Sequence, residues 1–403
     1  MHHPLGGTSK KASKKLPTLL LTVAAAATAA LLLAACGGSS NSSTPTPAAK
    51  QTSAPTQAAG ATTAAATSPC PPADAAKGLT GAGASFPFPL YSKWVDQFNK
   101  QCGIQINYQS VGSGAGISQI TAKTVDFGAS DGIMTDDQVA AAVAAGGPIL
   151  HIPMTSGAVA IIANLPNLQQ GQLKLTPDVL AGIYLKSITK WNDPAIVSLN
   201  PGLSLPSTDI TVVHRSDSSG TTFIFTNYLS KVSSDWQTKV GNATAVQWPG
   251  DVGGEKNDGV AQQVKQIQGA IGYVELAYAI QNNLNWASMQ NKAGNYVQPT
   301  LDSTTAASTG VTIPNDTRIM ITDSTNPNAY PIVGFTWILA YVNQPDKAKG
   351  EALVYYLWWS IHAGQQYSTA LLYAPLSPDT VKKAEAEIKS ITYQGQPLLQ
   401  LPQ

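Results

Sequence analysis

The sequence predicts an α/β protein with a mostly parallel sheet, because strand-like and helix-like segments alternate twice along it. The two alternations lie within residues 79–131 and residues 209–229. A chain of 403 residues is too long for one ordinary core and suits two domains, and 43% apolar with 12% charged residues is typical of a globular protein. Three short segments of glycine and hydroxyl residues mark the ends of the strands.

The first alternation begins with a turn-rich strand end at residues 79–83. Aromatic and apolar residues then recur at helical spacing, which predicts a helix that begins near Phe88. Residues 104–111 alternate as a strand does, and residues 117–124 are expected to form a helix. Residues 125–131 are expected to form the next strand and turn.

The second alternation places a strand at residues 209–214 and a helix that opens with residues 218–221. The first backbone N–H groups of a helix lack intrahelical partners, and the helix dipole is positive there. An anion is therefore stabilised at this end. Arg215 lies beside the same loop and is able to add a charge-assisted hydrogen bond.

Each of the three glycine segments has the composition of an anion cradle, since small residues let backbone N–H groups approach a ligand and a hydroxyl adds a donor. The segments span residues 83–86, 112–116 and 218–221. Taken singly, such a loop is more commonly only a helix cap or a turn. In α/β sheets, however, ligands collect at the carboxyl ends of strands, where we expect Ser85, Ser113 and Asp131 to meet.

The N-terminus has the pattern of a lipoprotein signal peptide. Four lysines lie within residues 10–15, residues 16–33 are apolar and rich in alanine, and Leu33-Ala34-Ala35-Cys36 resembles a signal-peptidase box. The alternative is a permanent transmembrane helix. We expect cleavage to remove residues 1–35 and to leave Cys36 as the lipidated N-terminus of a protein exported from the cytoplasm.

Residues 36–77 consist largely of Ser, Thr, Pro, Ala and Gln, so they cannot form a core and are expected to be a disordered tether. Loss of residues 1–35 removes four lysines and no acid, which changes the formal charge from +1 to −3. No basic cluster remains in the mature chain, so a nucleic-acid partner is not expected. A bound anion must be held by local donors.

Two cysteines remain besides Cys36. Cys70 and Cys102 are expected to form a disulfide in an oxidising compartment, the alternative being two free thiols. We expect neither a metal nor a cofactor, because the histidines of the mature chain are scattered without ligand-like spacing. These are His151, His214 and His362, which we expect to be structural.

The motifs in order closely resemble the phosphate-binding proteins of ABC-type phosphate importers. They are Gly-Ala-Gly-Ala-Ser-Phe-Pro, Gly-Ser-Gly-Ala-Gly, Val-Asp-Phe-Gly-Ala-Ser-Asp and His-Arg-Ser-Asp-Ser-Ser-Gly-Thr-Thr. The resemblance continues through Gly253-Gly-Glu-Lys-Asn-Asp-Gly259, Gly269-Ala-Ile-Gly-Tyr-Val-Glu-Leu-Ala-Tyr278 and Tyr330-Pro-Ile-Val. It covers essentially all of residues 79–390.

The resemblance implies a periplasmic-binding-protein fold of type II, with two α/β domains, a ligand cleft between them and two hinge crossovers. Domain I would comprise residues 78–155 and 328–403, and domain II residues 156–327. A monomeric, lipid-anchored and non-catalytic receptor would then deliver inorganic phosphate to the membrane permease subunits of an importer.

The resemblance also implies a set of ligand contacts. Matched motif to motif, these are Ser85, Phe86 through its N–H, Ser113, Asp131, Arg215, Ser219, Gly220 and Thr221. Ser85 stands where many members have threonine, which keeps the hydroxyl. Gly114-Ala115 stands where others have Ser-Gly, which removes a donor beyond Ser113.

Asp131 is the residue whose chemistry distinguishes phosphate from sulfate. Phosphate near neutral pH carries a proton that it can donate to a carboxylate, whereas sulfate carries none. Sites that pair a ligand hydroxyl reject analogues without it by roughly 10⁴ to 10⁵. The alternative role of Asp131 is that of a turn or cap residue. Asp217 is expected to orient Arg215.

Two other classes of function fit the sequence less well. A phosphoesterase or serine hydrolase would use Ser219 or Ser113 with His214, but the chain has no Gly-x-Ser-x-Gly elbow, no metal cluster and no Walker loop. His214 also precedes Arg215 on a predicted strand, so the two side chains point to opposite faces. An adhesive surface lipoprotein would explain the tether and none of the three cradles.

Overall fold

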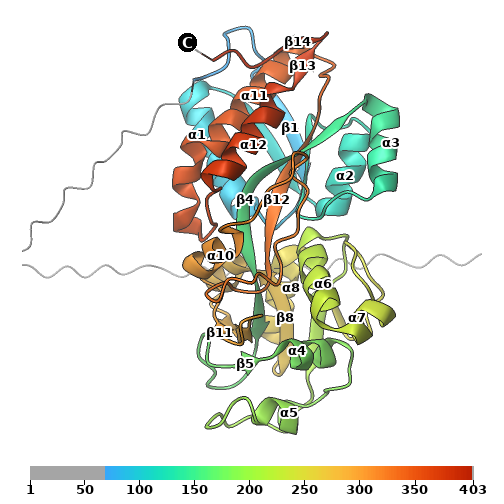
Figure 1. Cartoon of the computed structure of the whole chain (residues 1–403), viewed down its shortest axis with the longest axis vertical. Helices are drawn as coiled ribbons and strands as arrows, with labels where there is room; N and C mark the ends of the chain where they lie inside the picture. Colours follow the sequence, from blue (N-terminus) through green and yellow to red (C-terminus); the bar gives the residue numbers. More distant parts are fainter. Residues whose placement is uncertain (1–68, 402–403) are drawn as a thin grey trace, which may run out of the picture. The chain divides into compact units, whose positions relative to one another are not determined.

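A computed structural model describes residues 69–401 of the chain. Its main sheet has the strand order β2-β1-β3-β12-β4-β8-β6-β7 and runs through both halves of the molecule (Figure 1). Its strands are β1 (Gly78–Gly83), β2 (Gln105–Ser110), β3 (Phe127–Ser130), β4 (Ile149–Ala163), β6 (Thr211–Arg215), β7 (Val252–Gly254), β8 (Ala270–Glu275) and β12 (Val333–Tyr341), and β9 (Asn285–Trp286) pairs with β4 off this path.

Strand β4 connects the two halves of the sheet. It pairs antiparallel with β12 from Ile149 to Ala158 and with β8 from Val159 to Ala163. From His151 onward every residue of β4 is buried, so apolar packing holds both of its faces. The upper and lower halves of Figure 1 therefore share one hydrophobic core.

The prediction of a mostly parallel sheet holds for the outer strands and is wrong for the centre. Strand β1 pairs parallel with β2 and β3, and β6 pairs parallel with β7 and β8. Strand β12 is antiparallel to both of its neighbours. It comes from the C-terminal part of the chain rather than from a strand-helix-strand crossover, which the local pattern could not indicate.

Helix α1 (Phe88–Cys102) begins at the predicted residue, with a proline in its first turn, and buries Leu90, Tyr91, Trp94 and Phe98. The other helices of the upper half in Figure 1 lie around β1, β12 and the upper part of β4. They are α2 (Ser113–Thr121), α3 (Asp136–Gly146), α11 (Lys347–Ile361) and α12 (Pro378–Lys389), together with the 3₁₀ turns Ala363–Tyr367 and Thr369–Leu371 and the short hairpin β13 (Thr392–Tyr393) and β14 (Gln396–Pro397).

The lower half contains the second predicted alternation. Its helices are α4 (Pro177–Tyr184), α5 (Pro194–Val197), α6 (Gly220–Val232), α7 (Ser234–Lys239), α8 (Lys256–Gln266), α9 (Leu276–Gln281) and α10 (Leu301–Ser308). The strands β5 (Lys174–Leu175), β10 (Ser288–Gln290) and β11 (Tyr296–Val297) form a small separate sheet.

Cys70 and Cys102 form a disulfide, with the two Cα atoms 5.3 Å apart. It ties the residues before β1 to the end of α1. Ala75 is already buried, and the N–H of Ala76 donates to the carbonyl of Ala348. The chain therefore packs against the domain before residue 78, where the sequence placed the end of the tether.

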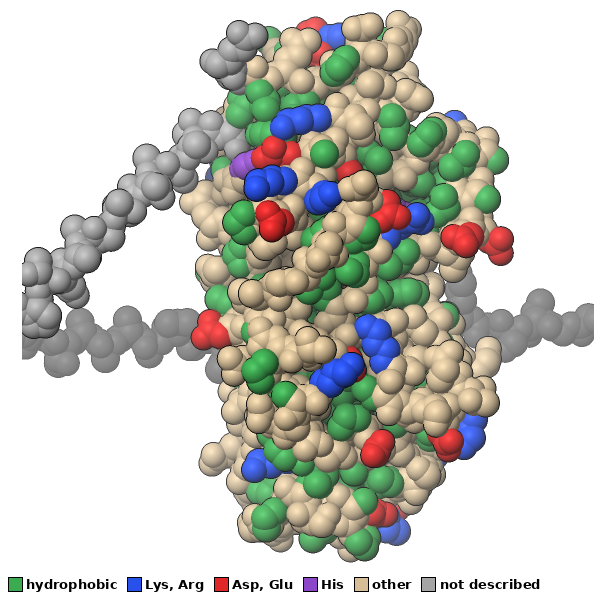
Figure 2. Space-filling view, in the orientation of Figure 1, with side chains coloured by type: hydrophobic (Ala, Val, Ile, Leu, Met, Phe, Trp, Pro, Cys, Tyr) green, Lys and Arg blue, Asp and Glu red, His purple; other side chains and the backbone are tan. Residues whose placement is uncertain are grey.

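The predicted signal peptide, Cys36 and most of the tether lie outside the described residues. Within residues 69–401, no helix has both the length and the apolar character needed to cross a membrane. On the face shown in Figure 2, acidic and basic side chains are interspersed rather than gathered into one patch.

Candidate anion-binding site

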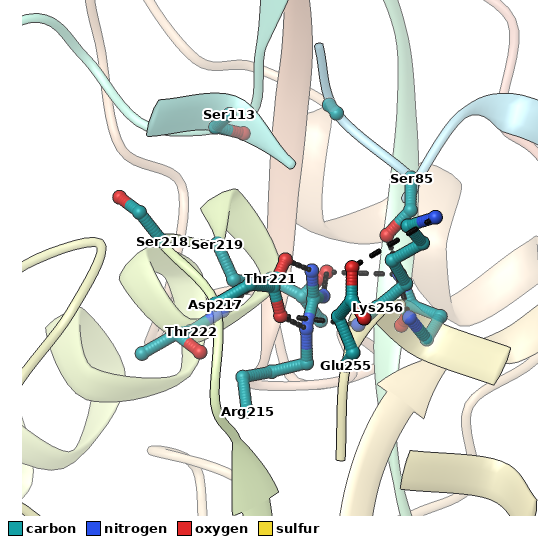
Figure 3. Close-up of polar contacts among 12 residues, drawn as sticks. Ser85, Ser113, Arg215, Asp217, Ser218, Ser219, Thr221, Thr222, Glu255 and Lys256 are labelled. Carbon is teal, nitrogen blue, oxygen red and sulfur yellow. Dashed lines mark hydrogen bonds and ion pairs between the residues drawn. The ribbon is translucent and has the colours of Figure 1, made fainter. Parts of the chain in front are cut away.

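The three cradles predicted from the sequence meet in the structure. Ser85 follows β1, Asp131 follows β3, and Ser219 caps the helix that follows β6, so each lies at the carboxyl end of a strand. Figure 3 shows Ser85 and Ser113 on one side and Arg215 and Thr221 on the other. The predicted contact residues are all buried: Ser85, Phe86, Ser113, Asp131, Arg215, Ser219, Gly220 and Thr221.

The loop before α6 directly contacts the first turn of α2. The N–H of Gly114 donates to the carbonyl of Ser218 over 3.1 Å. A side chain at Gly112, whose φ is +89°, would come within 2.7 Å of Asp217 Oδ2. The two sides of the site are therefore in contact, and only a glycine fits at this crossing.

Helix α2 begins at Ser113, four residues before the predicted start at Ile117. The glycine-rich segment forms the first turn of this helix instead of preceding it, so its free N–H groups belong to a helix N-terminus. The Ser113 hydroxyl accepts a hydrogen bond from the N–H of Asp131 over 3.2 Å. This contact fixes the position of Asp131 against α2.

Helix α6 presents the second N-terminus. The Ser219 hydroxyl accepts from the N–H of Thr222 over 3.1 Å and so caps the helix. The hydroxyl keeps its own hydrogen for another acceptor. Because the backbone N–H groups at the start of a helix lack intrahelical partners, Gly220 and Thr221 can offer theirs to an anion.

Arg215 and Asp217 form a two-point ion pair. The distances are 2.7 Å from Nε to Oδ1 and 2.5 Å from Nη2 to Oδ2. Burial by itself would raise the pKa of Asp217, but the hydrogen bonds and the charge of Arg215 outweigh it and hold that pKa below its ordinary value. The remaining nitrogen, Nη1, lies 3.3 Å from the hydroxyl of Thr221. The expected orienting role of Asp217 is thus visible in the geometry.

Asp131 is buried, and neither of its carboxylate oxygens has a hydrogen-bond partner among the described residues. Burial raises its pKa to about 7 and outweighs the lowering effects of the nearby Thr336 hydroxyl, the Arg215 charge and the nearby Ser113 hydroxyl, although neither hydroxyl lies in hydrogen-bond geometry to the carboxylate. An acid with this pKa can accept or donate a proton near neutral pH. Its oxygen Oδ2 faces the start of α6 at Gly220.

Two tyrosines hold the loop of the first cradle by its carbonyl groups. Tyr278 donates to the carbonyl of Ser85 over 2.5 Å, and Tyr373 lies 2.7 Å from the carbonyl of Phe86. Tyr373 is also 2.8 Å from Oε2 of Glu275. A tyrosine hydroxyl carries one hydrogen, so both contacts are hydrogen bonds only if Glu275 is protonated. Burial raises the pKa of Glu275 well above its ordinary value, which agrees with that proton.

Sequence reasoning missed four residues of this site: Asn257, Glu275, Tyr278 and Tyr373. The first three lie in segments that carry the family resemblance, but no local rule assigns them a role. They act on Ser85, Phe86 and Thr221 from distant parts of the chain. Only the assembled fold reveals these contacts.

The histidines have other partners. His214 stacks on Trp248 with ring centroids 4.9 Å apart, and His362 contacts Glu385. His151 accepts from the N–H of Met134, and burial lowers its pKa to about 4. Within residues 69–401, no three His, Cys, Asp or Glu side chains gather as metal ligands would.

Together, the fold and the paired helix N-termini indicate a binding protein, with a candidate ligand site where the ends of two groups of strands meet. A family profile described as a PBP superfamily domain matches residues 39–358, and the chain belongs to that superfamily. More narrowly, it belongs to the family of PstS phosphate-binding proteins, as its similarity to curated relatives shows. The resemblance and the fold class predicted from the sequence are thereby confirmed.

The relatives cover most of the chain. The phosphate-binding protein PstS of Xylella fastidiosa (strain 9a5c) is 47% identical over 325 residues, which are 80% of this chain and 88% of the relative. PstS of Pasteurella multocida is 44% identical over 317 residues, with coverages of 78% and 91%.

Solved structures agree in fold. A phosphate-bound periplasmic phosphate-binding protein, PfluDING, aligns with a TM-score of 0.62 and 22% identity, covering 79% of this chain and 96% of its own. A phosphate-binding protein from Stenotrophomonas maltophilia aligns with a TM-score of 0.61 at 19% identity, covering 77% and 94%.

Proposed function

We propose that this chain captures inorganic phosphate at the site between α2 and α6 and delivers it, without chemical turnover, to an ABC-type importer. The observation that carries the proposal is Asp131, a buried carboxylate that has no hydrogen-bond partner among the described residues and faces a helix N-terminus close to Arg215. A ligand that is both an anion and a proton donor suits these surroundings, and phosphate is such a ligand. The names of the relatives point to the same ligand.

The proposed contacts divide by chemistry. Hydroxyl groups, backbone N–H groups and the guanidinium donate to phosphate oxygens, while Asp131 accepts the phosphate proton. The donors are Ser85, Phe86 N–H, Ser113, Arg215, Ser219, Gly220 N–H and Thr221. Hydrogen bonds to charged groups contribute about 1.5–3 kcal/mol each, and a micromolar Kd requires about 8 kcal/mol in total. The set is therefore sufficient for reversible capture.

Domain I is proposed to comprise residues 78–155 and 328–403, and domain II residues 156–327. The first boundary falls inside β4, which pairs with β12 before it and with β8 after it. The second boundary precedes β12. Movement of the two domains about these strands would open and close the site.

We also propose that the protein is exported, lipidated on Cys36 and held at the outer face of the cell membrane by the tether, as a monomer that meets the permease subunits. The support is the sequence pattern of residues 1–77 together with the names of the relatives. Mass spectrometry of the protein from membranes would detect a diacylglycerol-modified Cys36. Recovery of an unprocessed N-terminus would contradict the anchor.

Isothermal titration tests the proposed ligand. Protein that begins after Cys36 and has been stripped of bound ligand is titrated at pH 8 with phosphate and then with sulfate. Phosphate should bind at one site with micromolar or tighter affinity, and sulfate should give no heat. A parallel assay with p-nitrophenyl phosphate should show no turnover. The absence of binding heat with phosphate would contradict the proposal, and so would hydrolysis of p-nitrophenyl phosphate that Ser219→Ala abolishes.

A further inference from the structure

Asn257 lies between the two sides of the site and contacts a hydroxyl on each. It is a fully buried residue in the first turn of α8. Its side-chain nitrogen Nδ2 is 3.0 Å from Oγ of Ser85 and 3.2 Å from Oγ1 of Thr221. Ser85 follows β1 and Thr221 is in α6, so one amide group joins two separate cradles.

The orientation of this amide follows from its third contact. Oδ1 of Asn257 is 2.9 Å from the backbone N–H of Glu275, which can only donate. The oxygen of the amide must therefore face Glu275, and the NH₂ group must face the two hydroxyls. An Asn NH₂ group has two hydrogens, one for each hydroxyl.

Both hydroxyls consequently accept from the protein. Thr221 Oγ1 also lies 3.3 Å from Nη1 of Arg215, and Ser85 Oγ lies 3.4 Å from the N–H of Asn257. Neither a guanidinium nor a backbone N–H accepts hydrogen bonds. Among the described residues, neither hydroxyl donates to a protein acceptor. Each keeps one hydrogen that points away from these donors.

We propose that Asn257 is a positioning residue that determines specificity, because it makes the hydroxyls of Ser85 and Thr221 hydrogen-bond donors to the ligand. A hydroxyl can normally donate or accept, so by itself it does not discriminate between ligands. With its acceptor role occupied by Asn257, it favours ligand atoms that accept, such as the unprotonated oxygens of a tetrahedral oxyanion. The inference rests on the proposed capture of phosphate at this site.

Asp131 and the two hydroxyls would then contact different oxygens of the ligand. Ser85 and Thr221 would contact unprotonated oxygens, and Asp131 would contact the protonated one. A ligand needs both kinds of oxygen to satisfy the whole site, because any mismatch leaves two donors or two acceptors facing each other. Asn257 thus contributes to selectivity without touching the ligand.

A double-mutant cycle on the full chain tests the proposal by phosphate titration. Ser85→Ala and Asn257→Ala should each weaken phosphate binding at least tenfold. In the Asn257→Ala background, Ser85→Ala should weaken phosphate binding less than about threefold, because the Ser85 hydroxyl is no longer fixed as a donor. Gln262→Ala, an exposed position on the same helix, should leave the Kd unchanged. Additive effects of Ser85→Ala and Asn257→Ala, or a normal Kd in Asn257→Ala, would overturn the inference.

Asn257→Asp provides a second test if the alanine variant does not fold. It keeps the oxygen that accepts from Glu275 and replaces the NH₂ group by an acceptor. Phosphate binding should fall at least 100-fold at pH 8. It should recover in part near pH 5, beyond any change in the wild type, because burial raises the pKa of the introduced carboxyl group, which is then protonated and can donate again. A pH-independent loss would contradict the proposal. Absence of phosphate binding in the wild-type protein would instead contradict the proposed function.

Discussion

Gly220 lies against Asp131 so closely that a Cβ atom at this glycine would overlap Oδ2 of the carboxylate and come within 2.5 Å of Oγ of Ser113. Gly220 begins α6 in the lower half of Figure 1, Ser113 begins α2 in the upper half, and Asp131 follows β3. The acid therefore packs directly against the helix N-terminus. We place the ligand at this junction.

Gly220→Ala should weaken phosphate binding at least 100-fold, because the methyl group would overlap Asp131 and Ser113 at this junction. Isothermal titration measures the effect. Gly78→Ala is a matched control, since a Cβ there meets only the carbonyl oxygen of Gln105 at 3.8 Å. Normal affinity in Gly220→Ala would show that the ligand binds elsewhere.

Sulfate binding should depend on pH through Asp131. The raised pKa of about 7 means that the carboxyl group is largely protonated at pH 5.5 and ionised at pH 8.5. A protonated carboxyl donates to sulfate, whereas a carboxylate repels it. Sulfate affinity should therefore rise about 30-fold from pH 8.5 to pH 5.5, the change in the protonated fraction for a pKa near 7. Titrations at both pH values measure it.

Asp131→Asn is the matching variant, because its amide donates at every pH. Its sulfate affinity should be independent of pH, and its preference for phosphate over sulfate should be smaller than in the wild type. If the substitution left the ratio of phosphate affinity to sulfate affinity unchanged, Asp131 would have no role in selectivity.

Arg215→Ala should weaken phosphate at least tenfold, about 1.4 kcal/mol, since one hydrogen bond to a charged group contributes about 1.5–3 kcal/mol. Arg215→Lys should not restore the affinity, because an ammonium group cannot make the two-point contact with Asp217. Arg318→Ala is the control. It removes an arginine that pairs with Asp316, and this variant should bind phosphate with normal affinity. Near-normal binding in Arg215→Ala would place the guanidinium outside the ligand site.

Glu275→Gln should make stability less dependent on pH. The folded-state pKa of Glu275 lies well above its ordinary value, so between the unfolded and folded pKa values the folded protein holds one proton more than the unfolded one. The stability that this proton gives is complete below the unfolded pKa and is lost as the pH rises through the folded pKa. Glutamine has no such proton to lose.

Melting temperatures at pH 5 and pH 8 test this prediction. The difference between them should be smaller in Glu275→Gln than in the wild type, because glutamine does not titrate. Asp137→Asn, an exposed acid in α3, serves as the control. An unchanged pH dependence in Glu275→Gln would mean that Glu275 is ionised in the folded protein.

The sequence predicted those parts of the fold that depend on local patterns. The start of α1 at Phe88 and the strands around residues 104–111 and 209–214 follow from periodicity, and the structure has them within one or two residues. Helix α2 begins earlier than predicted because glycines do not contribute to an apolar pattern. The antiparallel centre depends on β12, which pairs with a strand more than 170 residues away.

The candidate site also contains residues that a local pattern reveals and residues that depend on distant contacts. Ser85, Asp131 and Arg215 could be found because each lies in a glycine or hydroxyl motif at a strand end. Asn257 and Tyr373 could not, because their roles depend on contacts with residues 172 and 287 positions away. Such contacts carry no local pattern, so only the assembled structure reveals them.

A crystal structure of the protein grown with phosphate at pH 8 would locate the ligand directly. We expect one phosphate between α2 and α6, with one oxygen within hydrogen-bond distance of Asp131 and others on Arg215, Ser85 and the N–H groups that begin α6. Phosphate bound elsewhere, or bound without contact to Asp131, would contradict it.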